Sequence, residues 1–233
     1  MSAPAPRPGI LDISPYVGGE AHAPGVDRLI RLASNEGALG PSPRAMEAYR
    51  QAAAELHRYP DGGSTALRDG LARLYGLDVS RIVCGTGSDE LLGLLTRAYA
   101  GPGDEVLYSA HGFLMYPISA KSVGATPVAA PEKGLKADVD ALLAHVTERT
   151  KIVFIANPNN PTGSFLTTDE MRRLHAGLPE HVVLVIDAAY AEYVDRPDYT
   201  AGAELVEEFG NVVMTRTFSN ASTFSMFGIL SKF

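Results

Sequence analysis

The sequence predicts an α/β fold in which a mostly parallel sheet carries helices on both faces. From residue 81 onward, short apolar runs alternate with segments whose apolar residues keep helical spacing. Parallel strands need long crossover connections, so this alternation is typical of a parallel sheet enclosed by helices. The chain has 233 residues, 45% of them hydrophobic, which is enough to bury one sizeable core.

The first elements precede the sheet. Residues 1–30 are rich in proline and are expected to form an irregular arm. Ser42 and Pro43 predict a helix that runs to about residue 56, with serine as its N-cap and proline in the first helical position. After a turn cluster at residues 59–63, Ser64 is expected to cap a second helix in which the leucines keep helical spacing.

Strands and helices are then expected in strict alternation. The expected strands are residues 81–86, 105–109, 126–130, 151–156, 182–186 and 212–217. The expected helices are residues 91–100, 116–123, 139–146, 203–209 and one that ends near residue 176, which Thr167 and Glu170 open as a capping box. Residues 220–233 form an apolar tail in which no further strand or helix is expected.

Charge and composition exclude several classes of function. The net charge is -7 and no basic cluster stands out, so a nucleic-acid surface is not expected. Cys84 is the only cysteine, which excludes an intrachain disulfide and a cysteine metal cluster, and its apolar neighbours predict burial. The first ten residues lack the apolar core of a signal peptide, and no apolar run reaches membrane-spanning length. We therefore expect a cytoplasmic protein without membrane or nucleic-acid partners.

Polar segments follow several of the expected strands. Residues 85–90, Gly-Thr-Gly-Ser-Asp-Glu, join a strand to a helix, where backbone N–H groups and the helix dipole can meet an anion such as a phosphate. Taken alone, this segment favours an ordinary turn with Ser88 as the N-cap. Because ligands of parallel sheets bind at the carboxyl ends of the strands, the convergence of four such segments at one edge predicts a site there.

Two of these segments are more distinctive. Residues 157–163 read Asn-Pro-Asn-Asn-Pro-Thr-Gly, which is a rigid turn with more asparagine and proline than a plain connection needs. Asp187 ends an apolar strand, where a carboxylate is costly to bury unless it is paired. It either caps the turn that follows or keeps a heterocyclic nitrogen protonated, and Tyr190, three residues later, can share its pocket.

The order of these motifs resembles the class I and II, fold-type I aminotransferases, which depend on pyridoxal 5'-phosphate (PLP). The Asn-Asn-Pro-Thr-Gly, Asp-x-x-Tyr and Thr-Phe-Ser elements carry the likeness to the family as a whole. Residues 58–60, Arg-Tyr-Pro, and 111–116, His-Gly-Phe-Leu-Met-Tyr, point to the histidinol-phosphate aminotransferase subfamily. The likeness is expected to run from about residue 10 to residue 219.

The resemblance implies a role for each candidate residue. The phosphate of PLP would be held by one group of residues, the pyridine ring by another, and the partner's cofactor in a homodimer by Tyr59. The residues that would hold the phosphate are Ser88, Asp89, Thr217 and Ser219. Phe113 would stack on the pyridine ring, Asn160 and Tyr190 would hydrogen-bond the ring hydroxyl oxygen, and Asp187 would pair with the ring nitrogen. No metal ligands are implied.

The chain departs from the family pattern at the position of the Schiff-base lysine, which is Asn220. No catalytic residue is therefore assigned. The resemblance implies four parts: an arm at 1–30, a linker or small-domain remnant at 31–56, an incomplete PLP-binding domain at 57–219 and the tail at 220–233. It also implies a longer family chain with a C-terminal small domain that carries substrate-binding arginines. We expect either a truncated or frame-disrupted copy or a genuine short protein without catalysis.

The implied reaction is transamination between L-histidinol phosphate and 2-oxoglutarate in histidine biosynthesis, with this chain inactive as it stands. Aromatic amino acid aminotransferases and threonine-phosphate decarboxylase share the scaffold and remain alternatives. A noncatalytic remnant is the alternative from another class.

Overall fold

The computed structural model describes residues 6–16, 24–25, 35, 40–218 and 226–229 of the chain. Most of the expected arm, Ser219 and most of the tail, including Asn220, lie outside these residues. Within the described part of the arm there is one 3-10 turn, η1 (Ile10–Asp12), which lies beside α4 (Met115–Val123).

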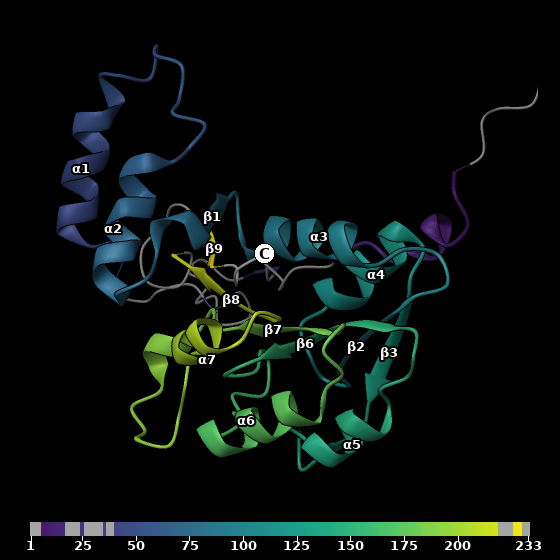
Figure 1. Cartoon of the computed structure of the whole chain (residues 1–233). Coiled ribbons are helices and arrows are strands. Elements are labelled where there is room, and N and C mark those ends of the chain that lie inside the picture. The colour runs from purple at the N-terminus through teal and green to yellow at the C-terminus, as the bar shows by residue number, and fades with distance from the viewer. Residues whose placement is uncertain (1–5, 17–23, 26–34, 36–39, 219–225, 230–233) are drawn as a thin grey trace, which may run out of the picture.

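A seven-stranded sheet forms the centre of the fold, in the order β1-β9-β8-β7-β6-β2-β3 (Figure 1). β2, β3, β6, β7 and β8 pair in parallel, so the predicted mostly parallel sheet is confirmed. The strand bounds are β1 (Ile82–Gly85), β2 (Glu105–Ser109), β3 (Thr126–Ala130), β6 (Thr150–Ala156), β7 (Val183–Asp187), β8 (Val212–Thr217) and β9 (Met226–Ile229).

β9 corrects one expectation. The backbone of Met226–Ile229 pairs antiparallel with β1 on one side and with β8 on the other. The tail therefore contains a strand, where the sequence pattern had indicated none. One of its two neighbours, β1, is distant in the sequence, and pairing with a distant strand leaves no local signal. Since β9 is antiparallel to both, β1 and β8 point the same way.

Helices cover both faces of the sheet, as predicted (Figure 1). α3 (Ser88–Tyr99) and α4 lie on one face, and α5 (Val139–Ala144), α6 (Thr168–Gly177) and α7 (Ala203–Glu208) lie on the other. α1 (Pro43–Ala53) and α2 (Thr65–Tyr75) stand at the end of the sheet near β1. The predicted capping box of Thr167 and Glu170 opens α6.

The core has two halves because side chains alternate between the faces of a strand. Ile152, Phe154 and Val185 join the cluster under α3 and α4, whereas Val153 and Ile186 join the cluster under α5, α6 and α7. Each large apolar side chain buried in this way contributes about 1.5–3 kcal/mol. This burial on both faces fixes the strands, and with them the positions at which the loops at the sheet edges begin.

Smaller elements complete the fold. β4 (Glu132–Lys133) and β5 (Lys136–Ala137) form a separate hairpin, and two 3-10 turns, η2 (Val79–Arg81) and η3 (Ala191–Tyr193), flank strands β1 and β7. Cys84 is only half-buried, not buried as predicted, because it packs against the rim of the core.

Candidate active site

The predicted segments meet at one edge of the sheet. β1, β2, β6, β7 and β8 run in the same direction, so the residues after each of them lie at the shared carboxyl edge. Short links join neighbouring segments: the Asn157 N–H donates to the Asp187 carbonyl oxygen at 2.9 Å, and the Asn159 side chain donates to the His111 carbonyl oxygen at 3.0 Å. The convergence predicted from the sequence is present.

Asp187 is the last residue of β7 and its side chain is buried, at 4% exposure. The Thr215 hydroxyl donates to its Oδ1 and the Tyr116 hydroxyl to its Oδ2, each at 3.0 Å. Burial raises the pKa of the Asp187 carboxyl, and the Asp89 charge adds to this, while the two hydroxyl hydrogen bonds oppose it. Within the described residues, Asp187 forms no ion pair.

The three asparagines in the loop after β6 have different surroundings. Asn157 is fully buried and its side chain bonds the backbone of Leu166 and Thr200, so it is a structural residue. Asn159 ties the loop to the β2 edge, and the Gly163 N–H closes the turn on the Asn159 carbonyl oxygen at 2.8 Å. Asn160 is left half-buried beside open space.

That space is a cavity of about 400 Å³. Asn160 and Tyr190 both line it, and their binding of one ligand atom stays a prediction. The Asn35 side chain, from before α1, donates to the Tyr190 hydroxyl oxygen at 2.8 Å. The remaining lining residues are Pro158, Asn159, Pro161, Gly163, Tyr193 and Val194.

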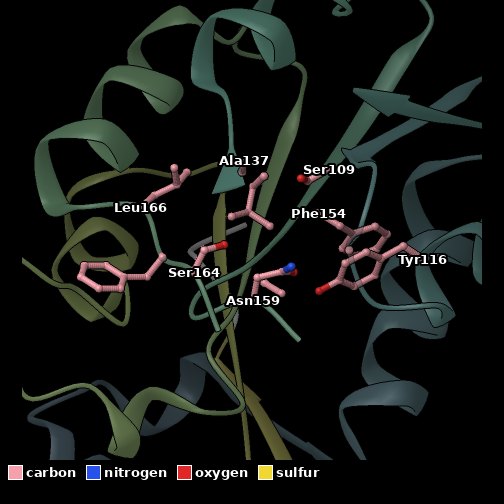
Figure 2. Close-up of a pocket in the computed structure, with 11 residues that line it drawn as sticks. Ser109, Tyr116, Ala137, Phe154, Asn159, Ser164 and Leu166 are labelled. Carbon is pink, nitrogen blue, oxygen red and sulfur yellow. The ribbon is translucent and has the colours of Figure 1, made fainter. Parts of the chain in front are cut away.

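A second, much smaller pocket lies deeper under the same edge, with a volume of about 10 Å³. Figure 2 shows Tyr116 and Asn159 on facing sides of it, with the Phe154 ring beside that of Tyr116. This volume admits at most one water molecule, so the pocket is a packing void and not a ligand site.

The start of α3 lies at this edge as well. Its N-cap is Gly87, with φ 138°, so the alternative in which Ser88 is the N-cap is wrong, and buried Ser88 is the first helical residue. The N–H groups of a first helical turn have no acceptor within the helix, so they can bind an anion. Asp89 is exposed by surface area, yet protein atoms around its carboxyl raise its pKa by desolvation. Thr217 is buried at the end of β8.

Phe113 sits on a braced loop after β2. The carboxylate of Glu132 accepts hydrogen bonds from the Ser109 hydroxyl and from the His111 backbone N–H, the latter at 2.9 Å. Its second oxygen lies 2.9 Å from His111 Nδ1. Desolvation alone would raise the pKa of Glu132, but these hydrogen bonds outweigh it and lower the pKa. At Gly112 an added Cβ would lie 2.9 Å from the Ser109 carbonyl oxygen, so the tight turn needs glycine.

One predicted residue, Tyr59, lies away from this edge. Tyr59 is 97% exposed in the turn between α1 and α2. Ser219 and Asn220 lie outside the described residues, so their predicted roles stay predictions. Among the residues that are described, no group of three or more His, Cys, Asp or Glu could hold a metal ion, and no helix is long and apolar enough to cross a membrane.

The family model for aminotransferase class I and II matches residues 27–229. The chain belongs to this family. The match extends past residue 219, where the sequence likeness was expected to end, and it includes β9.

Individual aminotransferases show the same similarity. The chain is 69% identical to histidinol-phosphate aminotransferase of Rhodospirillum centenum and 68% identical to that of Paramagnetospirillum magneticum, in each case over 94% of this chain and 60% of the relative. It matches the crystal structure of histidinol-phosphate aminotransferase from Sinorhizobium meliloti in complex with pyridoxal-5'-phosphate with a TM-score of 0.79 at 30% identity, covering 85% of this chain and 55% of that one. The chain thus spans about 60% of the length of these curated relatives.

Four residues near this edge were given no role from the sequence. Tyr116 and Thr215 bind Asp187, Asn35 binds Tyr190, and Glu132 braces the loop that carries Phe113. Thr215 left a usable signal, because it is a polar residue inside an apolar strand, two positions before Thr217 and therefore on the same face.

Proposed function

We propose that this chain forms the PLP-binding part of an aminotransferase whose substrates are L-histidinol phosphate and 2-oxoglutarate. Three relatives named histidinol-phosphate aminotransferase, at 63–69% identity over 93–94% of this chain, support the substrate assignment. The observation that carries the cofactor assignment is Asp187, a buried carboxylate at the carboxyl edge of the sheet.

The residues present fit the cofactor chemically. A buried carboxylate is costly unless a cation pairs with it, and no lysine or arginine of the described chain does so for Asp187. A protonated ring nitrogen would be such a cation. An anionic phosphate suits the first turn of α3, whose backbone N–H groups have no acceptor within the helix.

Each residue then has one task. The chain would hold the phosphate, the ring face, the ring hydroxyl oxygen and the ring nitrogen with separate groups from separate loops. These are Ser88, Asp89, Thr217 and Ser219 for the phosphate, Phe113 for the ring face, Asn160 and Tyr190 for the hydroxyl oxygen, and Asp187 for the nitrogen. When bound, PLP supplies the electron sink that amino-group transfer requires.

Position 220 limits what this chain does with the cofactor. Asn220 stands where the family's lysine is expected, and an amide can neither attach the cofactor nor carry a proton. Loss of a positioned acid–base group alone costs about 10² to 10⁴ in rate. We therefore propose noncovalent PLP binding without detectable transamination.

The first prediction is that PLP binds the wild-type chain saturably and without covalent attachment. It is checked by an absorbance titration, followed by borohydride reduction and mass spectrometry. We expect no covalent adduct in the wild type and an adduct at position 220 in Asn220→Lys. Asp187→Asn serves as the control that lacks the carboxylate. Attachment at a native lysine would contradict the proposal, and failure of every variant to bind PLP would favour a noncatalytic remnant.

The second prediction concerns a second copy of the chain. No residue of α1 is buried, and Leu56 and Tyr59, which follow it, are 78% and 97% exposed. Exposed apolar side chains that cluster favour association. We propose that a homodimer covers them and that Tyr59 reaches the partner's cofactor.

Sedimentation velocity should give twice the 24.7 kDa chain mass, and Leu56→Ser with Tyr59→Ser should weaken the dimer. Leu11→Ser, at an 83% exposed leucine on η1, is the matched control. A monomer at every concentration would refute this.

A further inference from the structure

Tyr116 joins two of the groups assigned to the cofactor. Its hydroxyl donates to Asp187 Oδ2 at 3.0 Å, and its ring meets the Phe113 ring edge to face, with centroids 6.0 Å apart at 87°. The Phe154 ring stacks on it at 4.8 Å and 9° (Figure 2). Tyr116 is fully buried, so these contacts fix both its ring and its hydroxyl.

We propose that Tyr116 is a positioning residue: its hydroxyl, together with that of Thr215, holds the Asp187 carboxylate ionised and in one orientation. This inference rests on the proposed function, because it assigns Tyr116 to the same PLP site. Tyr116 does not need to touch the cofactor for this role, since it acts through Asp187.

The two hydroxyls that hydrogen-bond the carboxylate come from different elements. Thr215 on β8 donates to Oδ1 and Tyr116 on α4 donates to Oδ2. Two donors on two oxygens fix the plane of the carboxylate. An ionised carboxylate offers about four lone-pair sites, so each oxygen keeps capacity for a further partner.

The surroundings of Asp187 otherwise oppose its charge. Burial raises its pKa, and the charge of Asp89 on α3 raises it further. The opposing contributions come from the Thr215 and Tyr116 hydroxyls and from the Ala189 N–H. Asp187 in turn affects Tyr116: burial and the Asp187 charge hold the pKa of Tyr116 well above its usual value. The Tyr116 hydroxyl therefore stays protonated and remains a hydrogen-bond donor.

A purely structural role for Tyr116 makes a different prediction. A buried, stacked ring would matter for packing alone, and removal of its oxygen would then leave the titration of Asp187 unchanged. Tyr116→Phe keeps the ring and deletes only that oxygen. Tyr108→Phe is the matched control, because the Tyr108 ring packs on Tyr116 from β2, at 6.3 Å, without an assigned role at Asp187.

The deciding measurement is the titration of Asp187 in the protein without cofactor, followed by carbon-13 NMR of labelled aspartate carboxyls. The Asp187 signal is identified by its absence in Asp187→Asn. We expect Tyr116→Phe to raise the proton affinity of Asp187 by about 10- to 100-fold, which corresponds to the loss of one hydrogen bond to a charged group. Thr215→Val should shift it in the same direction and Tyr108→Phe should not. An unchanged Asp187 titration in Tyr116→Phe, or an equal shift in Tyr108→Phe, would overturn the proposal.

PLP affinity supplies the second readout. The ionisation of PLP itself affects both proteins equally, so the ratio of wild-type to Tyr116→Phe affinity depends only on ionisation of groups in the protein. We expect this ratio to grow as pH falls, because the variant's Asp187 becomes protonated first. A ratio that is constant with pH would also overturn the proposal. If the wild type binds no PLP, the proposed function fails, while the NMR titration still decides whether Tyr116 controls Asp187.

Discussion

Asp187→Asn should make the protein more stable at neutral pH and a poorer binder of PLP. The substitution keeps the shape of the side chain but removes a buried charge whose only described compensation is a set of hydrogen bonds. Removing such a desolvation cost is expected to raise the free energy of unfolding by about 1–3 kcal/mol. Loss of the carboxylate should weaken PLP binding by about 2 kcal/mol or more, roughly 30-fold, as for one partner of a buried charge pair.

The pH dependence of the stability effect has a definite sign. The folded-state pKa of Asp187 lies above its usual value, so the wild type loses stability as pH rises from the unfolded pKa through the folded one. Asparagine does not titrate. The stability advantage of Asp187→Asn should therefore be smallest near the usual aspartate pKa of about 4 and should grow toward neutral pH.

Thermal and urea unfolding across this pH range measure the stability effect, and the absorbance titration measures PLP affinity. Asp195→Asn, at an exposed aspartate, is the matched control and should change neither. A variant less stable than the wild type at neutral pH would show that Asp187 does not carry a costly charge. A gain in stability together with a loss of binding is the usual trade-off at a functional site.

Much of the fold was predictable because its strands are continuous apolar runs between turn residues. The strands at residues 105–109, 126–130 and 212–217 were predicted residue for residue, and the helix boundaries differ by a few positions, as helix ends usually do. β9 was missed because one of its partners, β1, is distant in the sequence. The β4–β5 hairpin is local, and the glycine of its two-residue turn, Gly134, was a signal that the sequence analysis did not use.

The candidate site was predictable where polar residues interrupt the apolar pattern. Asp187 stands out for that reason, whereas the roles of Asn160 and Tyr190 came from the family resemblance; Asp187 ends β7, and Asn160 and Tyr190 line the cavity. Tyr116 ends the motif at residues 111–116, but its contact with Asp187 could not be predicted, because an aromatic residue inside a helix looks like an ordinary core residue. Its function depends on a hydroxyl aimed at a residue 71 positions away, which no sequence spacing reveals.

Asn157→Ala should have the largest effect on stability. Asn157 is fully buried, and its side chain accepts from the Leu166 N–H at 2.8 Å and donates to the Leu166 and Thr200 carbonyl oxygens at 3.2 and 3.1 Å. Alanine would leave three buried backbone groups without these partners. An unsatisfied buried group costs about 1–3 kcal/mol, so we expect a loss of about 3 kcal/mol or more.

The same residue also anchors the loop that carries Asn160. Its backbone N–H bonds the Asp187 carbonyl oxygen, and its carbonyl oxygen accepts from the Tyr199 hydroxyl at 2.7 Å. Urea unfolding should show a lower midpoint with an unchanged m-value if only stability is lost. Asn159→Ala, which removes side-chain bonds in a half-buried part of the same loop, is the matched control and should cost less. Equal losses in the two variants would mean that burial of Asn157 does not determine the cost. A loss confined to Asn157→Ala would assign the first asparagine of the motif to structure, in contrast to Asn159 and Asn160, which line the cavity.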